Sequence, residues 1–395
     1  MLVRPIRDDE VSAFRLAVMN VFGGDPANDP HGDERFRTLL APGRTFAAFD
    51  GSTIVGSAAT FDFTLTVPGG SLPIAGLTMV VVRPTHRRRG ILRELMEAHL
   101  EEARSRSMAV SGLWASEASI YGRFGYGIAA EADDLSFHAP EITFAPASTD
   151  EVVPIDEPTE VLPPIYDAAR AVRPGMITRT PAWWKYRRFA DRPDVARGAS
   201  PRRFAVARRD GIATGYVTYR HRGGWDDGLP AGTVEIDELV AVDGRAEASL
   251  WRLLTRIDLF PKVRYGNLPV DSVLPWIASD GRRLKRRRTD TLWLRIEDVP
   301  AALSARRYGV DGALRLEVEG KVHELRVEGG VASCGPSDPP AALRLDRPAL
   351  ANLYLGGVRA STLARAGRIE GDPAAVALAD RLFASPNAPW IAEVF

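Results

Sequence analysis

A short basic turn between an apolar run and an amphipathic run is the part of the sequence that most clearly indicates chemistry. The turn spans residues 87–90, follows the β-branched run 80–82 and ends in Gly90. Apolar residues then recur at helical spacing from Ile91. The first N–H groups of a helix have no partner within it, and the helix dipole favours negative charge there. Because glycine allows close backbone approach and arginine attracts anions, the segment predicts a phosphate-binding site.

Two tyrosines in the glycine-rich segment 116–128 are candidates for a proton donor. A phenol can protonate a leaving group that lies within hydrogen-bond reach. Tyr126 stands between Gly125 and Gly127, where backbone freedom can aim its ring into a cleft. Tyr121 stands at helical spacing from Phe124, as a packing residue would. We therefore favour Tyr126 and keep Tyr121 as the alternative.

The basic turn resembles the pyrophosphate loop of the GNAT acetyltransferases, Arg/Gln-x-x-Gly-x-Gly/Ala. Residues 87–92 match it except that Leu92 replaces the final small residue. Neither Gly-x-x-x-x-Gly-Lys-Ser/Thr nor Gly-x-Gly-x-x-Gly occurs in the sequence. The resemblance implies acetyl-CoA as the co-substrate. The residues that we expect to contact it are Val80, Val81, Val82, Arg87, Arg88, Arg89, Gly90, Ile91, Ser116 and Glu117.

The elements around this turn fit the mixed sheet of a GNAT domain. A strand over 3–6 precedes a helix that begins near Asp8, and the turn Asp50-Gly51 joins two apolar runs as a hairpin. The strand 77–82, a helix over 91–106 and a strand over 108–114 follow. We expect the first domain to span residues 1–140.

A second copy of this pattern follows at residues 141–292. Residues 204–216 resemble 46–57, the run 236–242 corresponds to the strand 77–82, and 246–254 corresponds to its helix. The connecting turn here begins with Asp243 and lacks the arginine triplet, so it would repel a pyrophosphate. We interpret this copy as a degenerate GNAT fold kept for structure. Its segment 181–188 predicts a helix, with Thr180 as the N-cap.

The last segment, residues 293–395, has a different character. Runs 313–318 and 324–328 alternate apolar and charged residues, as half-exposed strands do. Gly371-Asp372-Pro373 is typical of a helix start with Asp372 as the N-cap. The segment resembles a sterol-carrier-protein-2-like α/β domain. The sequence thus predicts an α/β protein (α+β mixed sheets) with tandem GNAT folds, the second degenerate, and this domain last.

Essentially the whole chain resembles the enhanced intracellular survival (Eis) family of acetyltransferases. Three features carry the resemblance in order: the loop 82–90, the segment 116–127 and the sterol-carrier-like end. The resemblance implies an acetyl-CoA-dependent N-acetyltransferase that acts on primary amines of polycations, such as aminoglycosides, polyamines or lysine side chains of peptides. It also implies a homohexamer.

The resemblance further implies roles for individual residues. Tyr126 is implied as the general acid, and the C-terminal carboxylate, here that of Phe395, as the base or the substrate anchor. A substrate cleft is implied as well, with Asp25 and Glu393 as its acids and Phe36 as an aromatic lining residue. The acids of the loop 24–34 fit solvated surface charges equally well, because proline and glycine mark it as a loop.

Composition limits the partners. Lys+Arg 51 balances Asp+Glu 51, so no global field favours nucleic acid or a membrane surface. The basic run 282–288 carries no interleaved aromatic residues, which favours a solvated face or interdomain salt bridges. The six histidines lack metal-ligand spacing and Cys334 is the single cysteine, so we predict no metal. A charged start without an apolar core predicts a cytoplasmic location, with unconventional export left open.

A lipid-binding protein is the alternative to an enzyme. In that interpretation both GNAT halves have decayed and the sterol-carrier-like domain binds the ligand. The intact loop 87–90 and Tyr126 favour the enzyme.

Overall fold

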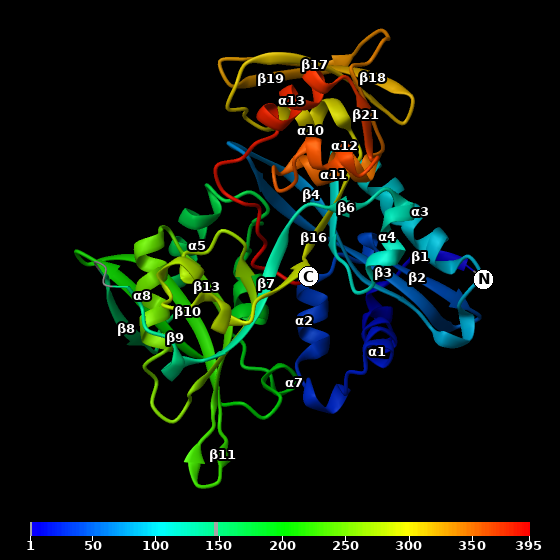
Figure 1. Ribbon diagram of the computed structural model, residues 1–395. Coiled ribbons are helices and arrows are strands. Elements are labelled where there is room, and N and C mark those ends of the chain that lie inside the picture. The colour runs from blue at the N-terminus through cyan, green and yellow to red at the C-terminus, as the bar shows by residue number, and fades with distance from the viewer. Residues whose placement is uncertain (1, 146–148) are drawn as a thin grey trace. The chain divides into compact units, whose positions relative to one another are not determined.

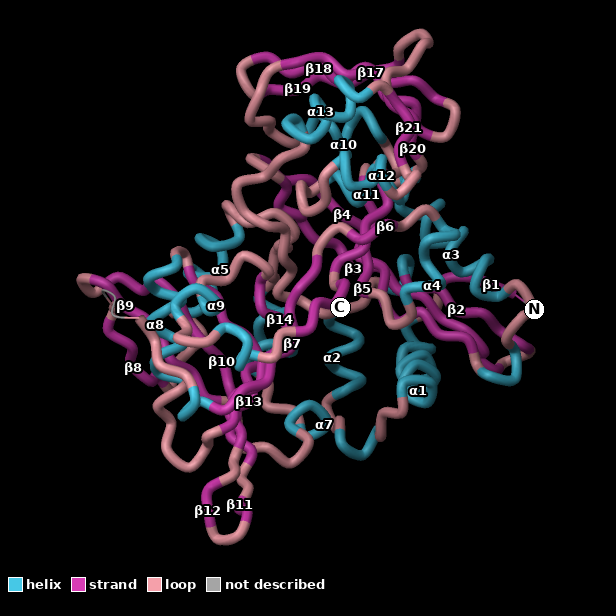
Figure 2. Tube along the Cα trace, viewed as in Figure 1, coloured by secondary structure: helices cyan, strands magenta, loops and turns pink. Residues whose placement is uncertain are grey.

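The structure is a computed structural model that describes residues 2–145 and 149–395 (Figures 1 and 2). The chain forms two compact units. The first unit comprises the residues up to Ala130 together with Arg173–Ala182 and Asp290–Phe395. The second unit comprises Glu131–Val172 and Trp183–Thr289.

The first sheet belongs to the first unit and follows the order β1-β2-β3-β4-β5-β16-β6. All of its neighbours are antiparallel except β4 and β5, which are parallel. Its strands are β1 (Leu2–Pro5), β2 (Thr45–Asp50), β3 (Thr53–Val67), β4 (Gly70–Val82), β5 (Val110–Trp114), β6 (Gly127–Ile128) and β16 (Leu292–Ile296).

Turn chemistry sets the first hairpins. Asp50-Gly51 joins β2 to β3 as predicted, with Gly51 at φ +59°. Pro68-Gly69 joins β3 to β4, with Gly69 at φ +66°. The strand predicted over 77–82 is only the last part of β4. The first part of this strand pairs with β3 but begins with Gly70, Ser71 and Pro73, which are not typical of an apolar strand.

Two helices of the first unit bury apolar residues against this sheet, α1 (Val11–Phe22) and α3 (Ile91–Ser105). The unit also contains α2 (Gly32–Leu39), α4 (Ala118–Tyr121) and short 3₁₀ turns at Asp8–Glu10, Pro26–Asn28, Pro42–Arg44, Pro84–His86 and Gly122–Phe124, whereas the 3₁₀ turn at Ala139–Glu141 belongs to the second unit. Helix α3 buries Ile91, Leu95 and Met96, so the predicted amphipathic helix after the basic turn is confirmed.

Strands β4 and β5 run side by side for a short distance only. The parallel pairing joins Ile74–Gly76 to Val110–Gly112, and both strands then continue unpaired with each other. An irregularity in the β3–β4 ladder, where Met79 has φ +53°, bends β4 just beyond this point. The sheet therefore opens between the ends of β4 and β5.

The second unit repeats this architecture in the order β15-β7-β14-β13-β10-β9-β8. Its elements are β7 (Glu131–His138), β8 (Glu151–Ile155), α5 (Leu162–Arg170), α7 (Pro193–Ala196), β9 (Arg203–Arg209), β10 (Ile212–Arg222), β11 (Trp225–Asp226), β12 (Leu229–Pro230), β13 (Thr233–Ala241), α8 (Gly244–Leu254), β14 (Lys262–Pro269), α9 (Leu274–Ile277), a 3₁₀ turn (Gly281–Leu284) and β15 (Arg287–Asp290). The predicted second copy is confirmed. The helix predicted over 181–188 is a short α6 (Pro181–Trp183) followed by a π-helical turn (Trp184–Phe189).

Each GNAT sheet takes one strand from the other's stretch of sequence. Strand β7 follows the first GNAT segment but pairs with β14 in the second sheet. Strand β16 follows the second GNAT segment but pairs with β5 and β6 in the first sheet. The division of the sequence at residues 140 and 292 stays a prediction about segments, while the sheets exchange strands across it.

The C-terminal part of the first unit forms a five-stranded sheet in the order β19-β18-β17-β20-β21 with helices packed on it. Its elements are α10 (Val299–Ala305), β17 (Gly312–Val318), β18 (Lys321–Glu328), β19 (Val331–Pro336), β20 (Leu343–Leu345), α11 (Arg347–Tyr354), α12 (Ala360–Arg365), β21 (Ile369–Gly371) and α13 (Pro373–Leu382). Asp372 caps α13 as predicted and accepts from the Ala374 amide. Among the helices described, none is long and apolar enough to cross a membrane.

Candidate active site

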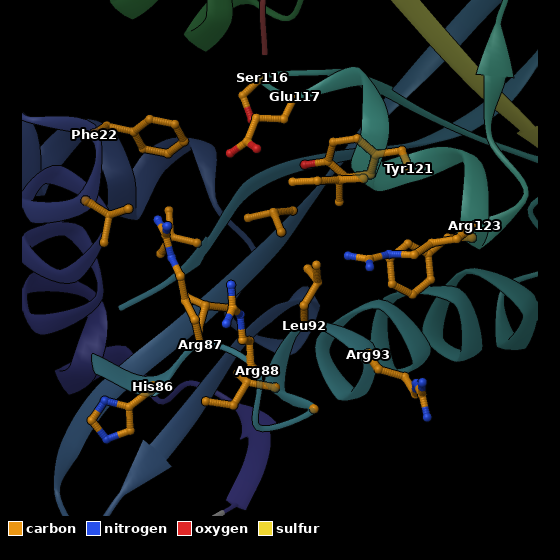
Figure 3. Close-up of a pocket in the computed structure, with 18 residues that line it drawn as sticks. Phe22, His86, Arg87, Arg88, Leu92, Arg93, Ser116, Glu117, Tyr121 and Arg123 are labelled. Atoms are coloured by element: carbon orange, nitrogen blue, oxygen red, sulfur yellow. The ribbon is translucent and has the colours of Figure 1, made fainter. Parts of the chain in front are cut away.

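A pocket of about 850 Å³ lies where the ends of β4 and β5 part (Figure 3). In Figure 3, Arg87 and Arg88 rise from the loop before α3 on one side, and Glu117 and Tyr121 lie on the other. The lining residues are Val21, Phe22, Val80, Val81, Val82, His86, Arg87, Arg88, Gly90, Ile91, Leu92, Arg93, Ser116, Glu117, Ile120, Tyr121, Arg123 and Phe124. This set contains all the residues expected to contact acetyl-CoA except Arg89, which is exposed outside the pocket.

The N-terminus of α3 is open toward this pocket. Gly90 is the N-cap at φ +84°, and no side chain caps the helix. A Cβ at Gly90 would meet no atom within 4 Å, so the space in front of the helix end is empty of protein. Uncapped N–H groups beside two arginines suit a phosphate group. The residues present therefore fit the pyrophosphate of a coenzyme A thioester.

The structure places the two tyrosines differently with respect to this pocket. Tyr121, at the end of α4, lines the pocket, whereas Tyr126 has no exposed surface and is not among the lining residues described. Gly125, at φ +80°, turns the chain so that Tyr126 enters the core, where its ring meets that of Tyr121 edge-on at 6.2 Å. Tyr126 is therefore not among the described residues that line this pocket, and its role as the general acid stays a prediction.

Tyr121 is suited to hold a proton at the pocket wall. Burial raises the pKa of its phenol above the ordinary value, and the charge of Glu117 adds to this effect. A hydrogen bond with Ser116 acts in the opposite direction. Since the ordinary value is already about 10, the phenol is protonated at neutral pH.

Tyr126 ends a buried chain of polar side chains instead. Its hydroxyl lies 2.7 Å from Ser111 Oγ, which lies 2.8 Å from His99 Nε2. His99 Nδ1 in turn lies 2.7 Å from Thr60 Oγ1. Burial lowers the pKa of His99 to about 3, so the ring is neutral at physiological pH. The chain ties β3, α3 and β5 together beside the residue pair Ala75–Ser111, one residue before β4 and β5 stop pairing.

The loop expected to supply substrate-binding acids is engaged with its own neighbours. Asp25 is exposed and accepts from the Ala27 amide at 2.9 Å, which caps the turn Pro26–Asn28. Asp29 is buried in an ion pair with Arg35. Phe36 is buried in the core, so it does not present an aromatic face to a ligand. Neither Asp25 nor Phe36 is among the described residues that line the pocket.

The C-terminal tail runs to the level at which β4 and β5 part. The ring of Phe395 lies 5.2 Å from that of Phe63 on β3, and a Cβ on Gly76 would lie 3.2 Å from it. Gly76 is the last β4 residue paired with β5. Glu393 is buried in an ion pair with Arg179. Its predicted role in substrate binding stays a prediction.

The corresponding region of the second unit is closed. Asp243 caps α8 by accepting from the Ala246 amide, and it also pairs with Arg209 at 2.9 Å. A Cβ on Gly244 would lie 2.8 Å from Val273 Cγ1. The N-terminus of α8 is therefore capped by Asp243 and covered by Val273.

Charged clusters elsewhere are paired within the second unit. The basic run 282–288 contributes Arg286 and Arg288, which bind Asp133 of β7, and Arg287, which binds Asp134. These pairs explain the run as structural charge within one unit. Across residues 2–145 and 149–395, no group of three or more histidine, cysteine, aspartate or glutamate side chains could hold a metal ion.

Known protein families agree with this arrangement. Residues 2–129 and 175–296 each match a family model described as an acetyltransferase (GNAT) domain, and residues 299–392 match a sterol carrier protein domain. N-acetyltransferase Eis of Mycobacterium tuberculosis is 36% identical over 390 residues, which cover 93% of this chain and 92% of that protein. The chain belongs to the Eis family of N-acetyltransferases.

Two further proteins extend the match over the full length of the chain. A Streptomyces avermitilis protein named "Uncharacterized N-acetyltransferase" is 37% identical over 409 residues, covering 100% of this chain and 99% of that protein. The crystal structure of Eis1 from Mycobacterium abscessus has a TM-score of 0.86 at 29% identity, with 100% of both chains covered. The tandem GNAT folds and the sterol-carrier-like domain are therefore the architecture of the Eis family, and the chain is an acetyltransferase.

Proposed function

We propose that this Eis-family enzyme transfers an acetyl group from acetyl-CoA to primary amines of polycations, such as aminoglycosides, polyamines or lysine side chains. One observation carries the proposal. The pocket at the opening between β4 and β5 joins an uncapped helix N-terminus, two arginines and a protonated phenol in one space. These are the groups needed to bind a pyrophosphate and to protonate a leaving thiolate.

The residues that would hold acetyl-CoA divide by charge. The N–H groups after Gly90 and the side chains of Arg87 and Arg88 would bind its phosphates. Val80–Val82, at the unpaired end of β4, would lie along its uncharged arm. Acetyl-CoA supplies the acetyl group as a thioester. An arginine on the loop binds a part of the co-substrate that does not react, so it contributes to affinity more than to turnover.

Proton transfer would be divided between Tyr121 and the tail. An amine at neutral pH is mostly charged, so a base must accept its proton before attack. We propose that Tyr121 donates its phenol proton to the departing sulfur and is the general acid. We propose that the α-carboxylate of Phe395 anchors the ammonium and accepts its proton, directly or through water.

The test is acetyl-CoA consumption measured with a panel of aminoglycosides, polyamines and lysine peptides. Turnover with at least one polycation and little with monoamines is the expected result if polycations are the substrate class. The absence of any acetyl-CoA-dependent heat or thermal shift would overturn the proposal, since a bound ligand at a hundredfold over its dissociation constant stabilises by about 2.7 kcal/mol.

The role of Phe395 has a separate test. The same enzyme is tagged at residue 1 and, in a second version, beyond Phe395, and both are assayed with one amine. The second version should lose turnover but bind acetyl-CoA within a few fold, because the addition moves the carboxylate and leaves the α3 loop unchanged. Equal rates would remove Phe395 from the mechanism.

The lipid-binding alternative is not favoured by the interior of the C-terminal domain. A buried guanidinium, that of Arg306, lies 4.6 Å from the centre of the Tyr308 ring and 5.0 Å from that of Phe383. It donates to the backbone oxygen of Tyr354. A charged group with its hydrogen bonds in this position suits a packed core and not an acyl chain.

We also propose that the chain assembles into a homohexamer in the cytoplasm, as the family resemblance implies. Large apolar side chains exposed on the second unit, Trp276, Trp225 and Ile212, are suited to contacts between copies. Light scattering at micromolar concentration is the measurement, and a mass near that of one chain, 43.1 kDa, would contradict the hexamer.

A further inference from the structure

We infer that residues 173–179 form a clamp that fixes the C-terminal tail, residues 388–395, in the active site, with Arg179 and Glu393 as its positioning pair. The inference rests on the proposed function, in which the tail forms the amine side of the site. The clamp belongs to the first unit, although in sequence it lies between the two stretches of the second unit.

The clamp is attached to the sheet on one side. Ile177 forms a β-bridge with Leu65 of β3. The Thr66 amide donates to the Met176 carbonyl, and the Gly175 amide donates to the Thr66 carbonyl, both at 2.8 Å. The Thr178 hydroxyl accepts from the Thr64 amide at 2.9 Å. The segment therefore pairs with β3 from Thr64 onward. Thr64 follows Phe63, whose ring contacts that of Phe395.

The clamp holds the tail on its other side at three points. Arg173 Nη1 donates to the Ala388 carbonyl at 3.0 Å, and the Trp390 amide donates to the Pro174 carbonyl at 2.9 Å. Gly175, at φ +94°, lets the Trp390 backbone pass close, since a Cβ there would lie 2.8 Å from the Trp390 oxygen. These contacts fix the backbone of the tail five to seven residues before Phe395.

The third point is the ion pair between Arg179 and Glu393. Their side chains are 0% and 1% exposed, so both charges are removed from water. A buried pair adds little net stability over apolar residues of the same volume, because desolvation offsets the attraction. It fixes geometry instead, and it lies two residues before Phe395. We therefore assign it a positioning role.

The experiment compares Arg179→Met with the double variant Arg179→Met/Glu393→Gln. The single variant removes this cation from the buried Glu393 carboxylate and should lower the melting temperature. The double variant should regain most of that loss. Both should lower kcat at least about tenfold, with the KM for acetyl-CoA within about threefold, because a displaced group costs rate rather than co-substrate affinity.

Arg209→Met is the control, since it removes one of the two arginines that pair with the buried Asp150 in the second unit. It should lower the melting temperature and leave kcat unchanged. If Arg179→Met does not fold, Gly175→Ala displaces the tail without changing a charge, and it should reduce kcat in the same way. Wild-type kcat in the folded Arg179 double variant, or an equal loss of kcat in the Arg209 control, would overturn the clamp.

Deletion of Val394–Phe395 separates the clamp from the proposed function. Loss of turnover on deletion with wild-type kcat in the Arg179 double variant would leave the base in place and reject the clamp. Normal turnover on deletion with reduced kcat in the Arg179 double variant would reject the Phe395 carboxylate and keep the clamp as the device that shapes the site.

Discussion

The two GNAT folds of the chain share a topology and differ at the end of one helix. In the first fold, Gly90 starts α3 without a side-chain cap, and the space before it is open. In the second fold, Asp243 caps α8 and Val273 covers its first residue. A helix N-terminus needs its orphan N–H groups satisfied, and a protein side chain can do this as well as a phosphate. An acidic residue at the start of α8 therefore satisfies as a cap the kind of N–H groups that α3 leaves open.

The two folds also differ in what occupies the opening between strands. In the second sheet, β13 and β14 pair only from Thr233 to Ile236 on β13. Beyond this point Glu238 is buried, accepts from the Tyr216 hydroxyl at 2.7 Å and pairs with Arg188. In the first sheet the same region is a pocket. The comparison shows that a fold can be retained after buried polar side chains fill its site.

The largest expected effect lies at the acid of the open fold. Tyr121→Phe should lower kcat by about 10²–10⁴, the contribution of a general acid, without a change in fold. Tyr126→Phe is the control, since it loses only one buried hydrogen bond worth about 1 kcal/mol of stability. Steady-state kinetics and thermal unfolding check both variants. A larger loss of kcat in Tyr126→Phe would restore the original ranking.

A substitution in the core of the second GNAT fold should lower the unfolding free energy and leave kcat unchanged. Arg188→Met leaves Glu238 buried without this cation, which should cost about 3–5 kcal/mol of unfolding free energy. Denaturant unfolding of the variant measures the loss. Because the second fold is assigned no chemistry, the kcat of the folded fraction should stay at the wild-type value. A selective loss of kcat would show that this fold takes part in catalysis.

Gly90→Asp gives the open fold the acid of the closed one. The carboxylate would repel the phosphates, and a side chain at φ +84° is strained, so we expect the KM for acetyl-CoA to rise by about a hundredfold. Gly90→Ala separates the two causes, because it adds the strain without the charge. Acetyl-CoA kinetics like those of the wild type in Gly90→Asp would place the phosphates elsewhere.

Acid should weaken the open fold through His99. Its folded pKa of about 3 lies below the ordinary value near 6.5, so below pH 6.5 the unfolded state binds the additional proton. Stability that is fully present above pH 6.5 is then lost as the pH falls, by about 1.4 kcal/mol per unit from this group. Between pH 7 and pH 4, the unfolding free energy of His99→Gln should fall less steeply with pH than that of the wild type. Identical slopes would mean that His99 is already charged in the fold.

The smallest effect concerns the cap of the closed fold. Asp243→Ala removes a helix cap and should cost about 1 kcal/mol of stability. It should not create a second acetyl-CoA site, because Val273 still covers Gly244 and the pair of Glu238 and Arg188 still fills the sheet opening. Calorimetric titration should give one acetyl-CoA per chain in both proteins. A stoichiometry of two would show that the acid alone had closed the site.

The sequence by itself determined the local elements and the phosphate loop. Glycine at a turn, apolar periodicity and the arginine run depend on neighbouring residues, so the hairpin at Asp50-Gly51, helix α3 and the cap at Asp372 could be predicted. The tandem GNAT pattern was visible for the same reason, because each copy repeats its local signals.

Only the tertiary structure decided which distant residues complete each sheet and which groups face the pocket. The exchange of β7 and β16 depends on pairing between segments more than a hundred residues apart, which leaves no local signal. The orientation of Tyr126 depends on a turn at Gly125. The environment of the Glu393 carboxylate depends on its ion pair with Arg179, which is distant in the sequence. A side chain's type states what chemistry it can perform, whereas burial and partners, which are set by long-range packing, decide whether it is free to perform it.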